Sequence, residues 1–262
     1  MTTETMWVAP APADLFAPET VDLDIVIPVL NEELRLGATL EEIRRELDRA
    51  PYRARVIVVD NGCTDATADV VDVMSERLDI TLISCAARGK GAAVRRGVLH
   101  STAPYVAYCD ADLSTPPSAL HTGMDLAAGG PGAVIGSRRV EGAEIAVAQP
   151  FLRRFGSRAF NRVAVQLVGP VRDTQCGFKL LDGDLARAVF EEMRTDGYAF
   201  DVELIARLQR RQTRMVEMPV TWSDNQGTRL RMASDGVRAF RDLLAVRRAI
   251  GAPSSDEVRR SA

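Results

Sequence analysis

Residues 21–60 read VDLDIVIPVLNEELRLGATLEEIRRELDRAPYRARVIVVD. Two short runs of apolar, β-branched residues, 21–29 and 54–60, stand on either side of a helix-length segment, 32–50. Buried strands of a parallel sheet have this near-continuous apolar pattern, and two parallel strands require a long connection such as a helix. The stretch therefore predicts a strand–helix–strand unit.

The same alternation continues beyond this unit. In chain order, helix-length segments and β-branched runs occupy residues 64–78, 80–85, 89–101, 104–110, 117–129 and 132–137. Such alternation is typical of an α/β fold, in which crossover helices cover the sheet. We therefore predict a mainly parallel central sheet with helices on both faces.

The pattern changes after residue 137. A polar stretch, a helix with apolar and basic stripes, a hinge segment, a strand-like segment and a closing helix occupy residues 138–150, 151–168, 169–181, 215–222 and 235–250. A further pair of helices is expected between the hinge segment and the strand-like segment. We expect this part to add a C-terminal helical extension to the sheet.

The two ends of the chain differ from the rest. Residues 1–20 are rich in Pro, Ala and Thr, and residues 251–262 are short and polar. Such segments bury too little apolar surface to order themselves. We predict flexible tails at both ends and a single domain over 21–250.

Composition excludes several classes of protein. The 262 residues include 33 basic and 36 acidic ones, so no strong positive field exists to bind nucleic acid. No run of about 18 apolar residues and no secretory signal is found. The four cysteines and two histidines have no zinc-site spacing. We expect a reduced, cytoplasmic protein.

Polar residues follow the first two predicted strands. Pro28 to Glu33 contain none of the glycines that a dinucleotide-binding turn requires. Asn31 could cap the next helix or contribute to a site. After the second strand, turn and capping chemistry accounts for Gly62 to Asp65, but it does not account for Asp60 and Asn61.

A glycine-rich helix start follows the third strand. Arg88-Gly89-Lys90-Gly91 would present free amides and the positive end of a helix dipole, which suit an anion. Lys90 and Lys179 are the only two lysines among the 33 basic residues, and both fall inside motifs. The pattern indicates a need for a compact ammonium charge at these positions.

Two carboxylates, Asp110 and Asp112, follow the fourth strand, just before Pro116-Pro117. In a strand they would point to opposite faces, but a turn can direct both to one point. Carboxylates are ligands that Mg²⁺ or Mn²⁺ prefers, and such ions share their coordination with substrate phosphates. The alternative is a pair of solvated, helix-capping aspartates.

Taken together and in this order, the motifs resemble family 2 glycosyltransferases of the GT-A fold. Asp110 to Pro117 and Asp173 to Lys179 resemble the branch of dolichyl- and polyprenyl-phosphate glucosyltransferases and mannose synthases. The resemblance implies a metal-dependent, inverting hexosyltransferase with a nucleotide-sugar half, 21–137, and an acceptor half, 138–250. Ser114 replaces a metal-binding glutamine of mannose synthases, which favours glucose over mannose.

The resemblance also implies site residues. The donor, UDP-glucose or GDP-mannose, would bind Pro28, Leu30, Glu32, Val59, Asn61, Lys90, Asp110, Ala111 and Asp112. Asp110 and Asp112 would hold Mg²⁺ or Mn²⁺, with Asp112 supporting catalysis at the leaving group. Asn61 stands where the family usually has an aspartate, so the resemblance leaves the base undetermined.

The acceptor site should be cationic. A lipid phosphate is already ionised at neutral pH and needs no general base, whereas a sugar hydroxyl needs one. The resemblance implies that a polyprenyl phosphate binds Arg138, Arg153, Ser157, Asp173, Gln175 and Lys179. It also places Arg138, Lys179 and Asp201 in catalysis, with Asp201 a base, a sugar contact or a helix cap.

Several alternatives remain at this point. The closing helix could lie on a membrane surface, which predicts weak, salt-sensitive association with the cytoplasmic face, or it could pack on the domain. The chain could act on a soluble small-molecule or saccharide acceptor. A sugar nucleotidyltransferase would need a glycine-rich loop after the first strand, and a non-catalytic nucleotide-sugar-binding protein would not need both aspartates.

Overall fold

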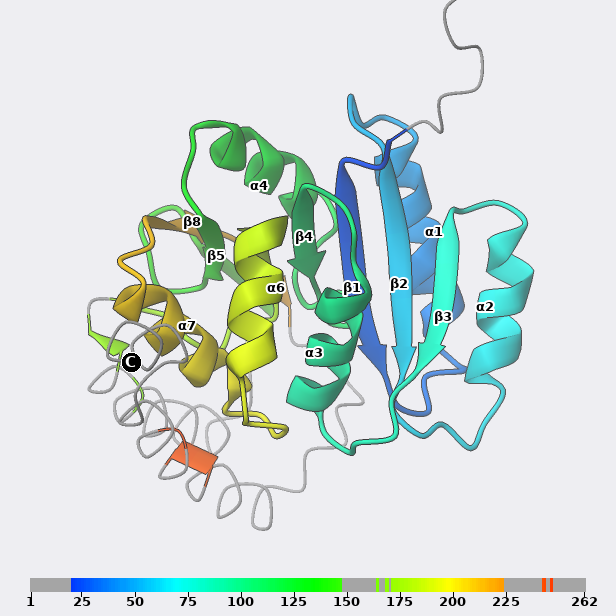
Figure 1. The fold of residues 1–262 in the computed structure, drawn as a ribbon. Coiled ribbons are helices and arrows are strands. Elements are labelled where there is room, and N and C mark those ends of the chain that lie inside the picture. The colour runs from blue at the N-terminus through cyan, green and yellow to red at the C-terminus, as the bar shows by residue number, and fades with distance from the viewer. Residues whose placement is uncertain are drawn as a thin grey trace, which may run out of the picture.

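The structure is a computed structural model (Figure 1). It describes residues 20–147, 164, 168–169, 171–223, 242–243 and 246. The predicted tails and most of the striped and closing helices lie outside the described residues, so the predicted domain boundaries stay predictions.

The central sheet has seven strands in the order β3-β2-β1-β4-β7-β5-β8. These are β1 Leu23–Val29, β2 Ala54–Asp60, β3 Ile80–Ser84, β4 Tyr105–Tyr108, β5 Ala133–Ser137, β7 Lys179–Asp182 and β8 Met215–Pro219. Strands β1 to β4 pair in parallel, as the alternation of strands and helices predicted. The predicted mainly parallel sheet is confirmed.

Helices cover both faces of this sheet. The helices are α1 Leu36–Leu47, α2 Thr67–Ser75, α3 Lys90–His100, α4 Ala119–Ala128, α6 Gly183–Glu192 and α7 Phe200–Arg210. Ile25 and Ile27 pack with α1, α2 and α4, while Val26 between them packs with α3, α6 and α7. Successive strand residues therefore reach opposite cores, which explains the unbroken apolar runs. In Figure 1, α3 and α6 lie in front of the sheet.

Two strand predictions are corrected. The hinge segment contains β7, which runs antiparallel between β4 and β5 at the centre of the second half of the sheet. The strand-like segment splits at Val220, because β9 Thr221–Ser223 leaves the main sheet and pairs with β6 Glu144–Val147. Such short runs carry too little periodicity to be recognised in the sequence.

Candidate active site

The acidic pair lies in the turn after β4, at the carboxyl-end edge of β1 to β4. Leu113 adopts a left-handed backbone with a φ of 49°, and its amide donates to the Asp110 carbonyl. The Asp112 Oδ1 accepts the Ser114 amide at 2.9 Å. Asp110 forms an ion pair with Lys90, with 2.5 Å between Oδ1 and Nζ. The turn thus directs the Asp110 carboxylate toward a cationic partner on α3.

Lys90, the first residue of α3, is the cation of this edge. Burial lowers its pKa, but the carboxylates of Asp110, Asp201 and Asp112 outweigh that effect and raise the pKa. Its ammonium group also lies 6.0 Å from the centre of the Phe200 ring. Lys90 is therefore held positively charged among three carboxylates.

The two glycines around Lys90 have a different role from the predicted one. The Gly89 amide donates to Asn61, and the Ala92 amide donates to the Asp196 carbonyl. A Cβ at Gly89 or Gly91 would overlap the loop between α6 and α7. These glycines therefore allow close packing of that loop, and the prediction of a free amide cradle is wrong at Gly89 and Ala92.

The predicted donor residues at the ends of β1 and β2 differ in their exposure to solvent. Pro28 pairs in register with Val59, and the side chains of Leu30 and Glu32 remain accessible at the strand end. Val59 is fully buried in the core beneath α3, so its side chain lies away from the accessible strand end, and its contact with the nucleotide stays a prediction. Its side chain points to the helix face because strand residues alternate.

Local hydrogen bonds account for the polar residues after these strands. Asn31 does not cap α1; its Oδ1 accepts the Thr64 amide at 2.7 Å and joins the two strand ends. The Asp60 Oδ1 accepts the amides of Gly62 and Cys63. Hydrogen bonds within the turn therefore account for Asp60 as well.

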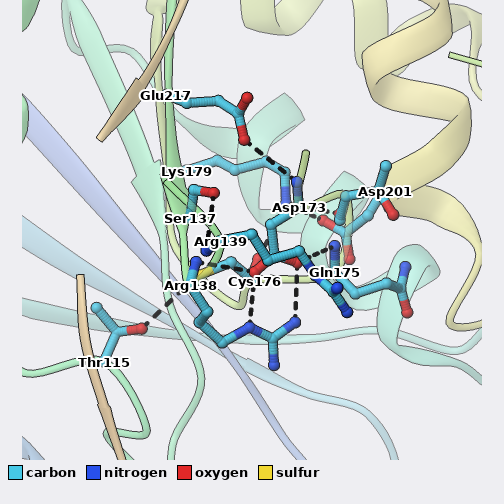
Figure 2. Close-up of polar contacts among 11 residues, drawn as sticks. Thr115, Ser137, Arg138, Arg139, Asp173, Gln175, Cys176, Lys179, Asp201 and Glu217 are labelled. Carbon is cyan, nitrogen blue, oxygen red and sulfur yellow. Dashed lines mark hydrogen bonds and ion pairs between the residues drawn. The ribbon is translucent and has the colours of Figure 1, made fainter. Parts of the chain in front are cut away.

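Arg138 follows β5 and forms a fork with Asp173 (Figure 2). Its Nε and Nη2 donate to the two carboxylate oxygens at 2.7 and 2.9 Å, and its guanidinium lies 5.3 Å from the Trp222 ring. Burial raises the pKa of Asp173, but the hydrogen bonds and charge of Arg138 lower it more. The structure thus brings two of the predicted acceptor residues together, with Asp173 orienting the arginine.

Glu217 on β8 supports this fork. Its carboxylate accepts the backbone amides of Arg172 and Asp173 at 3.0 and 3.2 Å. Neither Glu217 nor Trp222 was among the predicted site residues. No sequence motif marks them, because their role depends on β8 and β9 lying beside the 171–178 segment.

Lys179 and Asp201 form a buried ion pair (Figure 2), with 2.6 Å between Nζ and Oδ1. The Lys179 ammonium also donates to the carbonyls of Thr174 and Cys176, and Tyr108 donates its hydroxyl to Asp201 at 2.5 Å. Burial and the Asp201 charge raise the pKa of Tyr108 well above its ordinary value. Asp201 is not a helix cap, because α7 begins at Phe200.

The remaining predicted site residues are Arg153, Ser157, Gln175 and Ala111. Arg153 and Ser157 lie outside the described residues. The backbone amide of Gln175 donates to the Asp173 carboxylate, and its side-chain amide donates to the Tyr198 carbonyl. Ala111 is buried, and its carbonyl accepts the Thr39 hydroxyl.

Comparison with known proteins identifies the family. The model of "Glycosyl transferase family 2" matches residues 24–186. The chain belongs to this family. Dolichyl-phosphate beta-glucosyltransferase of Mus musculus is 32% identical over 246 residues, which cover 87% of this chain and 75% of that protein. The Dictyostelium discoideum protein of the same name is 29% identical over 244 residues, covering 87% and 75%.

Solved structures confirm the fold of this glycosyltransferase. Glucosyl-3-phosphoglycerate synthase from Mycobacterium tuberculosis in complex with UDP has a TM-score of 0.68 at 18% identity, covering 90% of this chain and 82% of that one. A structure of that synthase with Mn²⁺, UDP and phosphoglyceric acid has a TM-score of 0.67 at 17% identity, covering 90% and 80%. The predicted family and GT-A fold are confirmed.

The carboxylates of this glycosyltransferase fit a divalent cation that is shared with a substrate. Asp110 and Asp112 supply hard oxygen donors within one turn. In the part of the chain that the structure describes, no group of three or more His, Cys, Asp or Glu side chains could hold a metal. Two carboxylates suffice where substrate phosphates and water complete the coordination, as Mg²⁺ commonly requires.

None of the helices in the described part of the chain combines the length and apolar character needed to span a membrane.

Proposed function

We propose that this glycosyltransferase moves a glucosyl group from a nucleotide-diphosphate sugar to a polyprenyl phosphate such as dolichyl phosphate. The name of the relatives at about 30% identity supports the sugar and the acceptor. The resemblance at Ser114 favours glucose over mannose. The chemistry of the acceptor side supports a phosphate nucleophile independently of those names.

The observation that carries the proposal concerns Asp173 and Asp201. Both are buried and form ion pairs, Asp173 with Arg138 and Asp201 with Lys179. A hydroxyl acceptor needs a carboxylate that can take its proton, whereas an ionised phosphate has no proton to lose. Neither carboxylate is therefore free to approach an acceptor hydroxyl, and a phosphate acceptor needs no such base.

The reaction balances without a general base. An acceptor phosphate oxygen bonds to the anomeric carbon while the bond from that carbon to the diphosphate breaks, with inversion. The bonding electrons leave with the nucleoside diphosphate. Lys90 would stabilise that leaving group, and Arg138 would orient the incoming anion. Bound by Asp110 and Asp112, Mg²⁺ or Mn²⁺ would supply further charge stabilisation of the diphosphate.

The test is a panel of radiolabelled donors with a short polyprenyl phosphate. UDP-glucose, GDP-mannose and UDP-N-acetylglucosamine are each supplied with and without manganese, and the product is partitioned into organic solvent. We expect label from UDP-glucose in the lipid fraction, dependent on manganese. Conversion of the donor into labelled glucosyl-phosphoglyceric acid, with no label in the lipid fraction, would instead identify an enzyme with a soluble acceptor.

A variant serves as the control for the metal. Asp112→Ala removes one carboxylate from the proposed ion site and should lower kcat about a hundredfold or more, the usual loss when transition-state charge stabilisation is removed. Turnover that survives this substitution at the original rate would contradict the metal assignment while leaving the acceptor result intact.

The proposal includes peripheral contact with the cytoplasmic face of a membrane, where a polyprenyl phosphate resides. Binding to vesicles containing anionic lipid should be weak and should fall as salt rises. Partitioning between vesicles and buffer that does not respond to lipid composition or salt would contradict it.

A further inference from the structure

The side chain of Asn61 bridges two backbone groups on a neighbouring segment. Its Nδ2 donates to the Ala87 carbonyl at 2.6 Å, and its Oδ1 accepts the Gly89 amide at 2.9 Å. The side chain is buried, with 9% of the residue exposed. An ionised carboxylate could not do both, because the Ala87 carbonyl needs a donor and the Gly89 N–H needs an acceptor. These two partners also fix which end is nitrogen.

The bridged segment leads directly into Lys90. Gly89 has a φ of +126°, a conformation that L side chains rarely adopt, and its backbone packs against the Asp196 carbonyl. Asn61 therefore holds this unusual turn from the sheet side while the loop between α6 and α7 backs it from the other side. The next residue, Lys90, begins α3 and reaches Asp110.

We propose that Asn61 is a positioning residue of the donor site that acts through Lys90, and that this chain requires an amide at position 61. Both polar ends of the Asn61 side chain bind the backbone of the segment that leads into Lys90. An aspartate here would bring a carboxylate oxygen against the Ala87 carbonyl and push residues 87–89 away from β2. Lys90 would then lose its fixed position.

A pair of variants tests this role by nucleotide binding, without requiring turnover. Calorimetry with UDP and manganese is run on the full chain, the Asn61→Asp variant and the Asn61→Ala variant at about pH 8 and about pH 5. We expect both variants to bind UDP about tenfold more weakly at the higher pH, the loss expected for one or two buried hydrogen bonds. Burial beside the Ala87 carbonyl should raise the pKa of the new aspartic acid, and its protonated form can donate to Ala87. Asn61→Asp should therefore approach the full chain at the lower pH. Asn61→Ala should not.

A matched control separates this effect from a general effect of added charge. Asn31→Asp makes the same chemical change at the neighbouring strand end, where the Asn31 Oδ1 accepts the Thr64 amide. A carboxylate can still accept that bond. We therefore expect no recovery of UDP binding by Asn31→Asp as the pH falls, relative to the full chain.

Three results would overturn the proposal. The first is UDP binding by Asn61→Asp that equals that of the full chain at the higher pH. The second is a switch of preference from UDP to GDP in that variant, since it would mean that residue 61 acts through the nucleotide base and not through Lys90. The third needs no variant: rapid hydrogen exchange at the Gly89 amide of the full chain would contradict the bond to Asn61 even if the substitutions prevent folding.

The inference rests on the proposed function only in taking a nucleoside diphosphate as the donor-site ligand. If the full chain binds neither UDP nor GDP, the proposed function fails and the Gly89 exchange result still tests the role of Asn61.

Discussion

The two lysines of this chain form two lysine–aspartate ion pairs in opposite environments. The Lys90–Asp110 pair lies at the carboxyl-end edge of the sheet, with 21% and 31% of the side chains exposed, whereas Lys179 and Asp201 are 1% and 5% exposed. The first pair joins α3 to the turn after β4. The second joins β7 to α7 and also receives the Tyr108 hydroxyl.

The comparison shows that burial can give two similar ion pairs different roles. A partly exposed pair is suited to ligand binding, whereas a buried pair is suited to holding the fold together. Lys90 keeps partial access to solvent, so its ammonium can exchange the Asp110 carboxylate for a phosphate without leaving either partner isolated in the protein interior. A fully desolvated pair cannot separate without leaving an isolated buried charge. We therefore propose that Lys90 binds the donor diphosphate and that Lys179 positions the 173–178 segment.

The largest expected effect is on stability, from Lys179→Met. The substitution leaves Asp201 buried without its cation, which should lower the free energy of unfolding by about 3–5 kcal/mol. Urea denaturation measures it. The double variant Lys179→Met/Asp201→Asn removes both charges, keeps an acceptor for Tyr108 and should recover much of the loss. A loss below about 1 kcal/mol for the single variant would show that this pair is not the architectural one.

Lys90→Met should have the opposite effects: weaker UDP binding and little change in stability. Removing this cation should weaken UDP binding about tenfold to a hundredfold, because a charge-assisted contact is lost, while the free energy of unfolding changes by less than about 1 kcal/mol. Calorimetry and urea denaturation of the same preparation measure both. Unchanged UDP affinity would remove Lys90 from the donor site.

Gly177→Ala should sharpen the assignment by moving Asp110 without changing any charge. A methyl group at Gly177 would overlap the Asp110 carboxylate, and the Gly177 backbone is not in the left-handed region. We expect transfer to fall about tenfold, the cost of a small displacement at a site. Gly37→Ala is the matched control, because its added methyl would meet Val70 at an ordinary 3.6 Å. Equal activity of both variants would contradict the role of Asp110.

The smallest expected effect is on the stability that the Arg138–Asp173 ion pair contributes at acidic pH. The pKa of Asp173 is lowered from 3.8 in the folded chain, so the fork contributes stability above about pH 4 and loses it as the pH falls through the folded pKa. Urea denaturation of the full chain and Asp173→Asn should therefore give free energies of unfolding that converge as the pH is lowered from about 6 to about 3. A constant difference over this range would mean that Asp173 does not titrate with the fork.

Local pattern explains why much of the first half could be predicted. Strands β1 to β4 are apolar runs at the required spacing, and their carboxyl ends must share one edge, so Lys90, Asp110 and Asp112 had to lie near one another. Motif spacing also identified the family, which the comparisons confirmed.

The second half could be predicted less well, because its contacts join residues far apart in the chain. Glu217 supports a loop about 45 positions away, and Gly89 is required by the Asp196 carbonyl more than 100 positions away. Neither contact leaves a periodic or local signal. The short antiparallel strand β7 is recognisable only once β4 and β5 are beside it.

By itself, the sequence determined the alternation of strands and helices, the family, and the edge at which charged residues gather. Only the tertiary structure decided which of those residues keep access to water. It buried Val59, used both ends of Asn61 on backbone, and enclosed Lys179 with Asp201. The physical reason is that hydrophobic pattern and turn chemistry act over a few residues, whereas desolvation depends on everything that packs around a group.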